Sequence, residues 1–379
     1  MATPPRARRK LLTLGLPILL LLFAAWWINR QLEPNRLTAT VLQKAGAGLQ
    51  LDLRFQGTPQ YALKPEPRLL IPNFSARVPG GKVFLFARRA EISLPWSTIT
   101  GDEPVITRVE LDRPILNLPG LRSWLASRPQ VPFKLPVLSK GMRVVDGTIK
   151  DQGFSVTGLT LELPRLKTGD PLHVVADGVL QQDKNALAFK LDFNAATLRS
   201  VSDFTLHGSG ELQQSPTPVK FTLAANGRYQ SMDSVFSLDT QSLKLEISPP
   251  LATLSGKAQV AFGKQLQWRF DGVLADWPKT WPALPQPLAA NSKDLPVQLS
   301  YIGAPDLSDP IALTVIRKPT ELQATLRVRE LSGWLSTAKH SPLPPLNGTL
   351  RTPLLAIDGI KMEGVEIQIS DGKAAGAPP

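Results

Sequence analysis

From about residue 143 to residue 370, apolar and polar side chains alternate one by one along much of the chain. A period of two is the pattern of a β-strand that has one apolar face and one wet face. Helical patterns of about 10–15 residues do not separate these segments, which argues against strands and helices that alternate in a parallel sheet. We therefore predict an all-β fold with minor α content, built on a curved antiparallel β-sheet. A β-sandwich is the alternative, because its strands carry the same alternation.

Glycines recur within this part of the chain at spacings close to multiples of roughly 16 residues. The glycines in question are Gly178, Gly210, Gly227, Gly256 and Gly272. A strand of about ten residues followed by a turn produces such a spacing, which favours a meander of similar strands.

The N-terminus combines a basic cluster with a long apolar stretch. Leu11 to Ile28 contains no charged side chain, and about 20 apolar residues are enough for a helix to cross the hydrocarbon core of a bilayer. Basic residues before a span stay in the cytoplasm, and tryptophans favour the membrane interface. The residues that define this topology are Arg6, Arg8, Arg9, Lys10, Trp26 and Trp27.

A cleaved signal peptide is the alternative for this segment. Its apolar region is usually only about 7–15 residues long and ends at a small-residue cleavage site, whereas Ala24 and Ala25 run directly into the two tryptophans. We therefore predict a single-pass anchor in the cell inner membrane, with the bulk of the chain in the periplasm. The absence of cysteine is compatible with such an oxidising compartment.

Proline-rich breaks and changes in pattern divide the chain. A short helix is expected from Pro34 to Gly48, and one or two helical turns are expected from Leu121 to Arg128. The expected order is a basic tail at 1–10, the anchor at 11–28, an α+β cap region at 29–135, a β-groove region at 136–276, a proline-rich linker at 277–296, a C-terminal β region at 297–370 and a disordered tail at 371–379.

The composition excludes several kinds of active site. The chain has no cysteine, and its three histidines, His173, His207 and His340, lie far apart in the sequence. Nucleophile-elbow, phosphate-loop, zinc-protease and dinucleotide-binding motifs are missing. We therefore expect a protein that is not an enzyme and that has no cofactor or metal. Of its net charge of +12, four charges belong to the N-terminal basic cluster, and the rest is spread through the strands without a Lys/Arg run after residue 10. Nucleic acid is therefore not expected as a partner.

The apolar face of the alternating strands is the remaining candidate site. In a sandwich this face would pack as core, and in an open curved sheet it would line a groove that could hold acyl chains. Periodicity does not choose between the two. The groove candidates are Leu187, Phe189, Leu191, Phe193, Val219, Phe221, Leu223, Leu266, Trp268 and Phe270.

The order of several segments resembles the AsmA-like family of bacterial inner-membrane-anchored envelope proteins. In that order, an anchor and a short helix precede strand-like segments and recurring strand pairs. The segments that carry the resemblance are Tyr61 to Leu69, Ala90 to Trp96, Ile106 to Leu118, Asp146 to Ile149 with Val156 to Leu161, and Asn347 to Leu350 with Ile357 to Ile360 and Gly364 to Ile367.

This resemblance implies a repeating β-groove with an apolar inner channel and a role in outer-membrane biogenesis. The larger family members are thought to conduct phospholipids between the two membranes. A chain of this length would form some 20 strands at about 4.8 Å each, or about 95 Å, which is too short to bridge a periplasm alone.

We therefore expect a protein that binds or hands on phospholipid at the inner membrane, with other envelope proteins as further partners. One rival is a scaffold for envelope assembly or secretion whose β-sandwich needs no ligand. Another is an enzyme that acts on envelope glycans, for which the sequence offers no motif.

Overall fold

A computed structural model describes most of the chain. The described residues are 34–62, 66–95, 106–127, 137–182, 185–213, 218–232, 235–248, 253–263, 265–275, 294–328, 330, 345–357 and 360–370. The predicted anchor at 11–28, its flanking topology residues and the tail at 371–379 lie outside these residues. No helix in the described part of the chain is long and apolar enough to cross a membrane.

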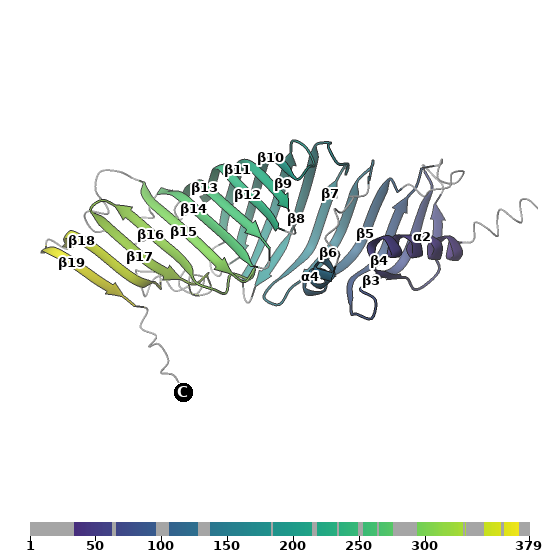
Figure 1. Cartoon of the computed structure of the whole chain (residues 1–379), viewed down its shortest axis with the longest axis horizontal. Helices are drawn as coiled ribbons and strands as arrows, with labels where there is room; N and C mark the ends of the chain where they lie inside the picture. Colours follow the sequence, from purple (N-terminus) through teal and green to yellow (C-terminus); the bar gives the residue numbers. More distant parts are fainter. Residues whose placement is uncertain are drawn as a thin grey trace, which may run out of the picture. The chain divides into compact units, whose positions relative to one another are not determined.

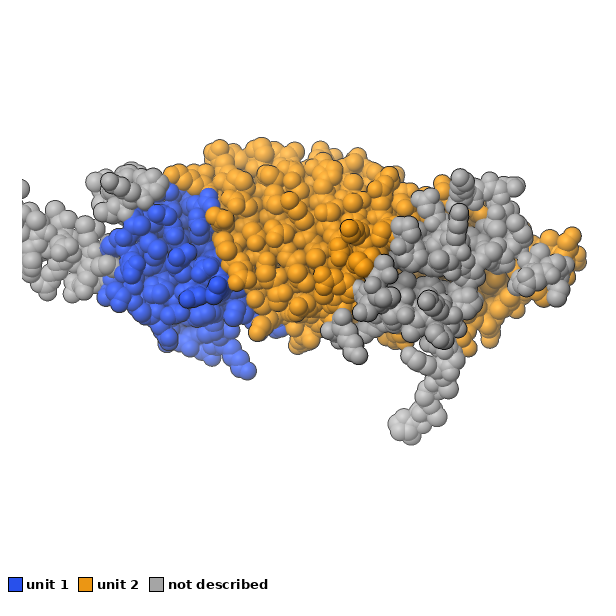
Figure 2. All heavy atoms as spheres, turned by 180° about the vertical axis from the view of Figure 1, so that it is seen from behind, with its two compact units in different colours: residues 1–126 blue, residues 127–379 orange. Residues whose placement is uncertain are grey.

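The chain divides into two compact units. Unit 1 contains Met1–Ala126 and unit 2 contains Ser127–Pro379, drawn in blue and orange in Figure 2. The boundary lies between Ala126 and Ser127, a few residues before the end of the predicted cap region at residue 135. Both regions predicted on either side of the proline-rich linker belong to unit 2.

In its described residues, unit 1 contains five strands, and helices accompany them (Figure 1). Its β1 and β2 pair with opposite ends of β3, β4 pairs along β3, and β5 pairs with β4, always antiparallel. The predicted helix at 34–48 is confirmed as α2 and the predicted helical turns at 121–128 as α4. The elements are α2 (Pro34–Leu49), β1 (Asp52–Arg54), β2 (Gln60–Ala62), β3 (Arg68–Arg77), β4 (Val83–Ser93), β5 (Arg108–Asn117) and α4 (Leu118–Ser127).

The helices of unit 1 are fastened to the sheet by apolar packing. Leu42 of α2 is buried in one cluster with Leu69 and Ile71 of β3. Trp124 of α4 stacks on Phe84 with ring centroids 6.0 Å apart, and its Nε1 donates a hydrogen bond to the Leu49 carbonyl at 3.0 Å. One aromatic side chain therefore joins α4 to both β4 and the end of α2.

Unit 2 is a strand-by-strand meander in which each strand from β6 to β19 pairs antiparallel with the next one in the chain. The strands are β6 (Met142–Lys150), β7 (Ser155–Leu163), β8 (Leu172–Gln182), β9 (Asn185–Ala195), β10 (Val201–Gln213), β11 (Val219–Met232), β12 (Val235–Ile247), β13 (Thr253–Phe262), β14 (Leu266–Ala275), β15 (Leu295–Gly303), β16 (Ile311–Arg317), β17 (Thr320–Leu326), β18 (Asn347–Ile357) and β19 (Ile360–Ile369).

This unbroken ladder confirms the predicted antiparallel β-sheet and replaces the sandwich alternative for the described part of unit 2. A sandwich needs two separate sheets face to face, whereas each strand here contacts chiefly its two neighbours in the chain. The predicted linker at 277–296 ends earlier than expected, because β15 begins at Leu295 and pairs with β14. Pro296 fits this strand because it lies near the strand start, where a missing N–H is tolerated.

The sheet of unit 2 is curved, so that turns far apart in the strand order lie close together. The Gln182 side chain at the end of β8 donates a hydrogen bond to the Asp306 carbonyl at 2.8 Å. Gly153, in the turn after β6, lies so close to Asp306 that an added Cβ would be 2.6 Å from the Asp306 Cβ. These contacts join the turn after β6 and the end of β8 to the connection between β15 and β16, so the sheet curves between them, as sheets with the usual twist between neighbouring strands can do.

A bulge in β12 keeps its apolar residues on one face. Asn226 lies opposite Ser242 but Gly227 lies opposite Thr240, so β12 holds one extra residue here. The bulge interrupts the backbone pairing of β12 with β13, and the Thr240 hydroxyl takes the place of the missing partners. It donates to the Ala258 carbonyl at 3.0 Å and accepts from the Ala258 N–H at 2.6 Å. The side chain thus satisfies two buried backbone groups.

We predict that Thr240→Val lowers the free energy of unfolding by about 2 kcal/mol, because two buried backbone groups lose their partner. The matched control is Thr205→Val, an exposed position on β10, which should change stability by less than about 0.5 kcal/mol. Urea denaturation followed by circular dichroism measures both. Equal midpoints for the two variants would contradict this role of Thr240.

Tyr61 is a second residue whose effect on stability can be measured. It packs on the apolar cluster of unit 1, and its buried hydroxyl has no hydrogen-bond partner within the described residues. Burial raises the pKa of Tyr61 to about 12. Tyr61→Phe should therefore raise stability by about 1 kcal/mol at neutral pH.

The pH dependence has a defined sign. Tyrosine in the unfolded chain ionises near pH 10, so stability due to the neutral Tyr61 phenol is present below pH 10 and is lost as pH rises toward about 12. Wild type should lose more stability than Tyr61→Phe over this window. Parallel pH profiles for the two proteins would show that the Tyr61 phenol ionises normally.

Candidate functional site

The ten predicted groove candidates lie on one face of unit 2. Strand β10 lies between the candidates on β9 and those on β11. In each row of paired residues, one β10 residue lies between a β9 candidate and a β11 residue. The row that contains Leu223 runs across the next strands through Leu245 on β12 and Leu254 on β13 to Leu274 on β14. Because side chains two residues apart share a face, Leu266, Trp268 and Phe270 lie on the same side as Leu274. We call this surface the apolar face.

Glycines alternate with large rings on the apolar face. One cross-strand row reads Gly178, Phe189, Gly210, Phe221 and Ile247 from β8 to β12. An added Cβ at Gly210 would lie 2.6 Å from two carbon atoms of the Phe221 ring. The ring therefore covers the glycine, and the row needs a residue without a side chain at this position.

The same explanation extends to other glycines of the predicted spacing. Gly256 and Gly272 lie opposite each other on β13 and β14, also on the apolar face. An added Cβ at Gly272 would lie 2.7 Å from the Phe270 Cζ. The spacing of roughly 16 residues thus places small residues beside rings on a common face.

The groove candidates differ in burial along the sheet. Leu266 and Phe270 on β14 are buried, with 8% and 5% of their surface exposed. The eight other candidates, on β9 and β11 and at Trp268, are all half-buried. The apolar face is therefore packed as core around β14 and keeps partly accessible side chains around β9 and β11.

An aromatic ladder crosses the apolar face near the turns at one end of the strands. Phe193 stacks on Phe204 at 5.6 Å and lies 6.4 Å from Tyr229, whose ring stacks on Phe236 at 5.9 Å. Phe236 lies opposite Phe262 on β13. The ladder passes from buried Phe204 and Tyr229 to Phe236 and Phe262, which are 37% and 46% exposed.

Sequence reasoning missed four members of this ladder: Phe204, Tyr229, Phe236 and Phe262. A signal for Tyr229 was present, because the alternation of Val219, Phe221 and Leu223 continues through Ala225 and Gly227 to Tyr229. The convergence of the rings depends on strand register, which the pattern within one strand does not contain.

Polar contacts of Tyr229 fix the position of the ladder. Its hydroxyl lies 3.0 Å from the carbonyl oxygens of Thr197 and Arg199, which can both accept its proton, and it accepts the Arg199 N–H at 3.3 Å. The connection between β9 and β10 is thus bound to β11. A buried tyrosine whose polar end is satisfied in this way can pack its ring in an apolar surface.

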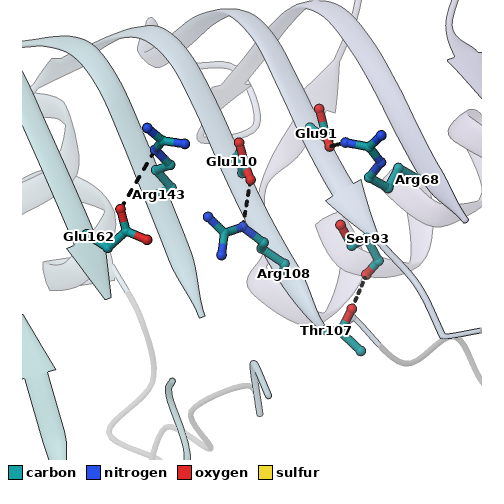
Figure 3. Close-up of polar contacts among 8 residues, drawn as sticks. All are labelled: Arg68, Glu91, Ser93, Thr107, Arg108, Glu110, Arg143 and Glu162. Atoms are coloured by element: carbon teal, nitrogen blue, oxygen red, sulfur yellow. Dashed lines mark hydrogen bonds and ion pairs between the residues drawn. The ribbon is translucent and has the colours of Figure 1, made fainter. Parts of the chain in front are cut away.

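The opposite face of unit 2 carries charged side chains that form cross-strand ion pairs. Arg228 on β11 contacts Asp203 on β10 at 3.3 Å, and both side chains are exposed. Arg143 on β6 lies 3.8 Å from Glu162 on β7 (Figure 3). This face is accordingly solvated, and the two faces of the sheet differ in chemistry along the same strands.

Unit 1 carries a group of paired charges across its own strands. Arg68 Nη1 donates to Glu91 Oε1 at 2.7 Å, and Arg108 Nε donates to Glu110 Oε1 at 2.6 Å (Figure 3). Glu91 and Glu110 lie directly opposite each other on β4 and β5. Like charges in this position repel, so the two arginines offset that repulsion and help to hold the register.

The charged residues do not assemble a metal centre in the described part of the chain. No group of three or more histidine, aspartate or glutamate side chains is placed there to hold a metal ion. The most distinctive part of the described surface is the apolar face, which is extended and is flanked by solvated edges.

Comparisons with models of known protein families, with curated proteins and with solved structures find no match for this chain. The resemblance to the AsmA-like family therefore stays a prediction.

We predict that Tyr229→Phe lowers the free energy of unfolding by about 1–3 kcal/mol, because backbone groups of the β9–β10 connection lose their partner. Phe236→Tyr is a useful control, since a hydroxyl added to an exposed ring should change stability by less than about 0.5 kcal/mol. Urea midpoints compare the two. An unchanged midpoint for Tyr229→Phe would mean that its hydrogen bonds do not hold the connection in solution.

Proposed function

We propose that this chain is an AsmA-like protein, anchored in the cell inner membrane, that binds or hands on phospholipid along the apolar face of unit 2. The observation that carries the proposal is the partly accessible part of this face on β9 and β11. There Phe189, Phe193 and Phe221 are half-buried although they belong to a continuous apolar surface. In a fully packed core such side chains would be buried on all sides.

The physical mechanism is passive transfer. Acyl chains exchange bilayer contacts for contacts with the apolar face, while head groups stay at the wet edges of the strands. Burial of one methylene group contributes about 0.8 kcal/mol, so an acyl chain of a dozen methylenes can be held by dispersion and the hydrophobic effect alone. Glycines leave hollows and rings leave ridges along each cross-strand row, and flexible acyl chains can adapt to such a surface.

The proposed location depends on the N-terminal sequence. A charge-free stretch from Leu11 to Ile28, preceded by four basic residues, is suited to a single inner-membrane span with the rest of the chain in the periplasm. A role in outer-membrane biogenesis follows from the family resemblance. Other envelope proteins would then receive or deliver the lipid.

A non-enzymatic envelope scaffold is the second candidate. It is favoured by the packing around β14, where Ala258, Phe270 and Val297 form a buried cluster. If the whole apolar face behaves in this way in the cell, it needs no ligand. A protein partner would then be the functional contact.

The decisive test uses two adjacent positions on β11 that face opposite sides. Leu223 lies on the apolar face, whereas Ala224 is exposed on the polar face. We predict that the photoreactive residue p-benzoylphenylalanine forms a phospholipid adduct at Leu223 in the full chain in living Gram-negative cells, with about tenfold less adduct at Ala224. Mass spectrometry of the purified protein after irradiation measures both adducts.

A charge on the apolar face supplies the control. Phe221→Asp should reduce the Leu223 adduct about tenfold or more, because a carboxylate makes acyl contact costly. Ala224→Asp, on the exposed polar face and opposite Lys244 on β12, should leave it unchanged. Equal adducts at Leu223 and Ala224, or an absence of lipid adducts in a folded protein, would support the scaffold instead.

A further inference from the structure

Two opposite edges of the unit 2 sheet touch each other. Strands β6 and β8 run in the same direction, so the turn after β6 and the end of β8 lie at one edge, which we call the first edge. Strand β15 runs the other way, so its connection to β16 lies at the opposite edge. Gln182 at the end of β8 nevertheless donates a hydrogen bond to the Asp306 carbonyl at 2.8 Å, and Gly153 packs against the Asp306 side chain. The sheet between β8 and β15 therefore coils far enough to bring its two edges together.

The coil has the apolar face on its inside. Residues 304–310 connect β15 to β16, and we call them the strap. Leu307 of the strap packs against the apolar cluster that contains Leu266 and Tyr301. This cluster belongs to the apolar face, because Tyr301 lies opposite Trp268 on β14. The strap therefore bends toward the apolar side of the sheet before it meets the first edge.

The section that the coil encloses is the part of the apolar face proposed to hold lipid. The strands between the two touching edges are β9 to β14, and they carry all ten groove candidates. The half-burial of the candidates on β9 and β11 fits a concave surface that the strap closes on one side. Acyl chains that approach these strands from that side must pass the seam between the strap and the first edge.

Hydrogen bonds within the strap and to the end of β15 give the strap a defined shape. Asp309 Oδ2 accepts the Ala304 N–H at 2.9 Å, and Asp306 Oδ1 accepts the Ser308 N–H at 3.0 Å. The Tyr301 hydroxyl donates to the Ala304 carbonyl at 2.6 Å. The strap can therefore separate from the first edge as one body and keep its own hydrogen bonds.

The contact between the strap and the first edge is of a weaker kind than the strand pairing around it. It includes the hydrogen bond from the half-buried Gln182 side chain and the close packing of Gly153, where an added Cβ would lie 2.6 Å from the Asp306 Cβ. A hydrogen bond between uncharged groups stabilises a contact only modestly. Local opening at such a contact needs much less free energy than separation of paired strands.

We propose that the strap controls the entry of phospholipid: its release from Gln182 and Gly153 opens the coil, and its return closes the coil over the bound acyl chains. This inference rests on the proposed function and deepens it by assigning the step that regulates loading of the apolar face. The strap changes the rate at which lipid enters, so the rate of loading is the quantity to measure.

The absence of cysteine from the chain allows the strap to be locked with one engineered disulfide. The Cβ atoms of a disulfide are about 3.8 Å apart, so Gly153→Cys with Asp306→Cys requires the two turns to separate by only about 1 Å. The full chain carries p-benzoylphenylalanine at Leu223 and is reconstituted in phosphatidylcholine nanodiscs. Vesicles of acyl-deuterated phosphatidylethanolamine and phosphatidylglycerol are then added, and mass spectrometry follows the deuterated adduct with time.

The oxidised protein should load deuterated lipid about tenfold more slowly than the same protein after reduction with dithiothreitol, because loading scales with the open population. Ser300→Cys with Ala312→Cys is the control pair: these exposed residues lie opposite each other on β15 and β16, and their oxidation should leave the rate unchanged. Equal rates for the oxidised and reduced Gly153–Asp306 pair would overturn the proposal. A folded protein in which this pair stays reduced under oxidant would also overturn it, because the strap would not touch the first edge.

Two adjacent glutamines test the opposite change. Gln182→Ala removes the hydrogen bond to Asp306 and should speed loading about fivefold, because the open strap becomes more populated. Gln181→Ala is the matched control, since Gln181 is exposed, and should load at the wild-type rate. Equal rates for the two variants at unchanged melting temperature would overturn Gln182 as part of the contact that holds the strap.

The strap and the proposed function fail in different ways. Leu223 adducts that form at the same rate with the strap locked or free would support lipid binding and overturn the role of the strap. An absence of adducts in both states of a folded protein would overturn lipid binding on the apolar face, and the role of the strap with it.

Discussion

The architecture of unit 2 depends on one constraint: every strand must pair with its neighbour in a register that keeps apolar residues on the same side. A slip by one residue would turn a whole strand over. The bulge in β12 shows how strictly this holds. Apolar positions change from Leu238 to Leu243, an odd step, and the extra residue restores them to one face. Thr240 then satisfies the backbone groups that the bulge leaves without ladder partners.

This constraint explains the glycines as well as the strands. The described strands of unit 2 form a single sheet, in which large side chains can gain burial by leaning onto neighbours on the same face. Phe221 covers Gly210 and Phe270 covers Gly272 in this way. The aromatic ladder from Phe193 to Phe236 adds contact between rings across successive strands. The apolar face is thus stabilised laterally while parts of it stay accessible. The apolar face of unit 2 offers extended apolar area and polar edges, which suits several acyl chains with little demand on the head group.

Much of the fold was determined by the sequence itself, because a period of two is local: the alternation from Leu187 to Phe193 already specifies a strand and the side chains that share its face. The ten groove candidates could therefore be chosen without a structure. Only the tertiary structure decided what lies between strands. Register brought Phe204, Tyr229 and Phe236 together, and β1–β3 pairing placed Arg77 beside Asp52. The unbroken ladder joined the described strands of unit 2 in one sheet rather than two. These contacts join residues distant in sequence, and hydrophobic periodicity contains no information about such pairs.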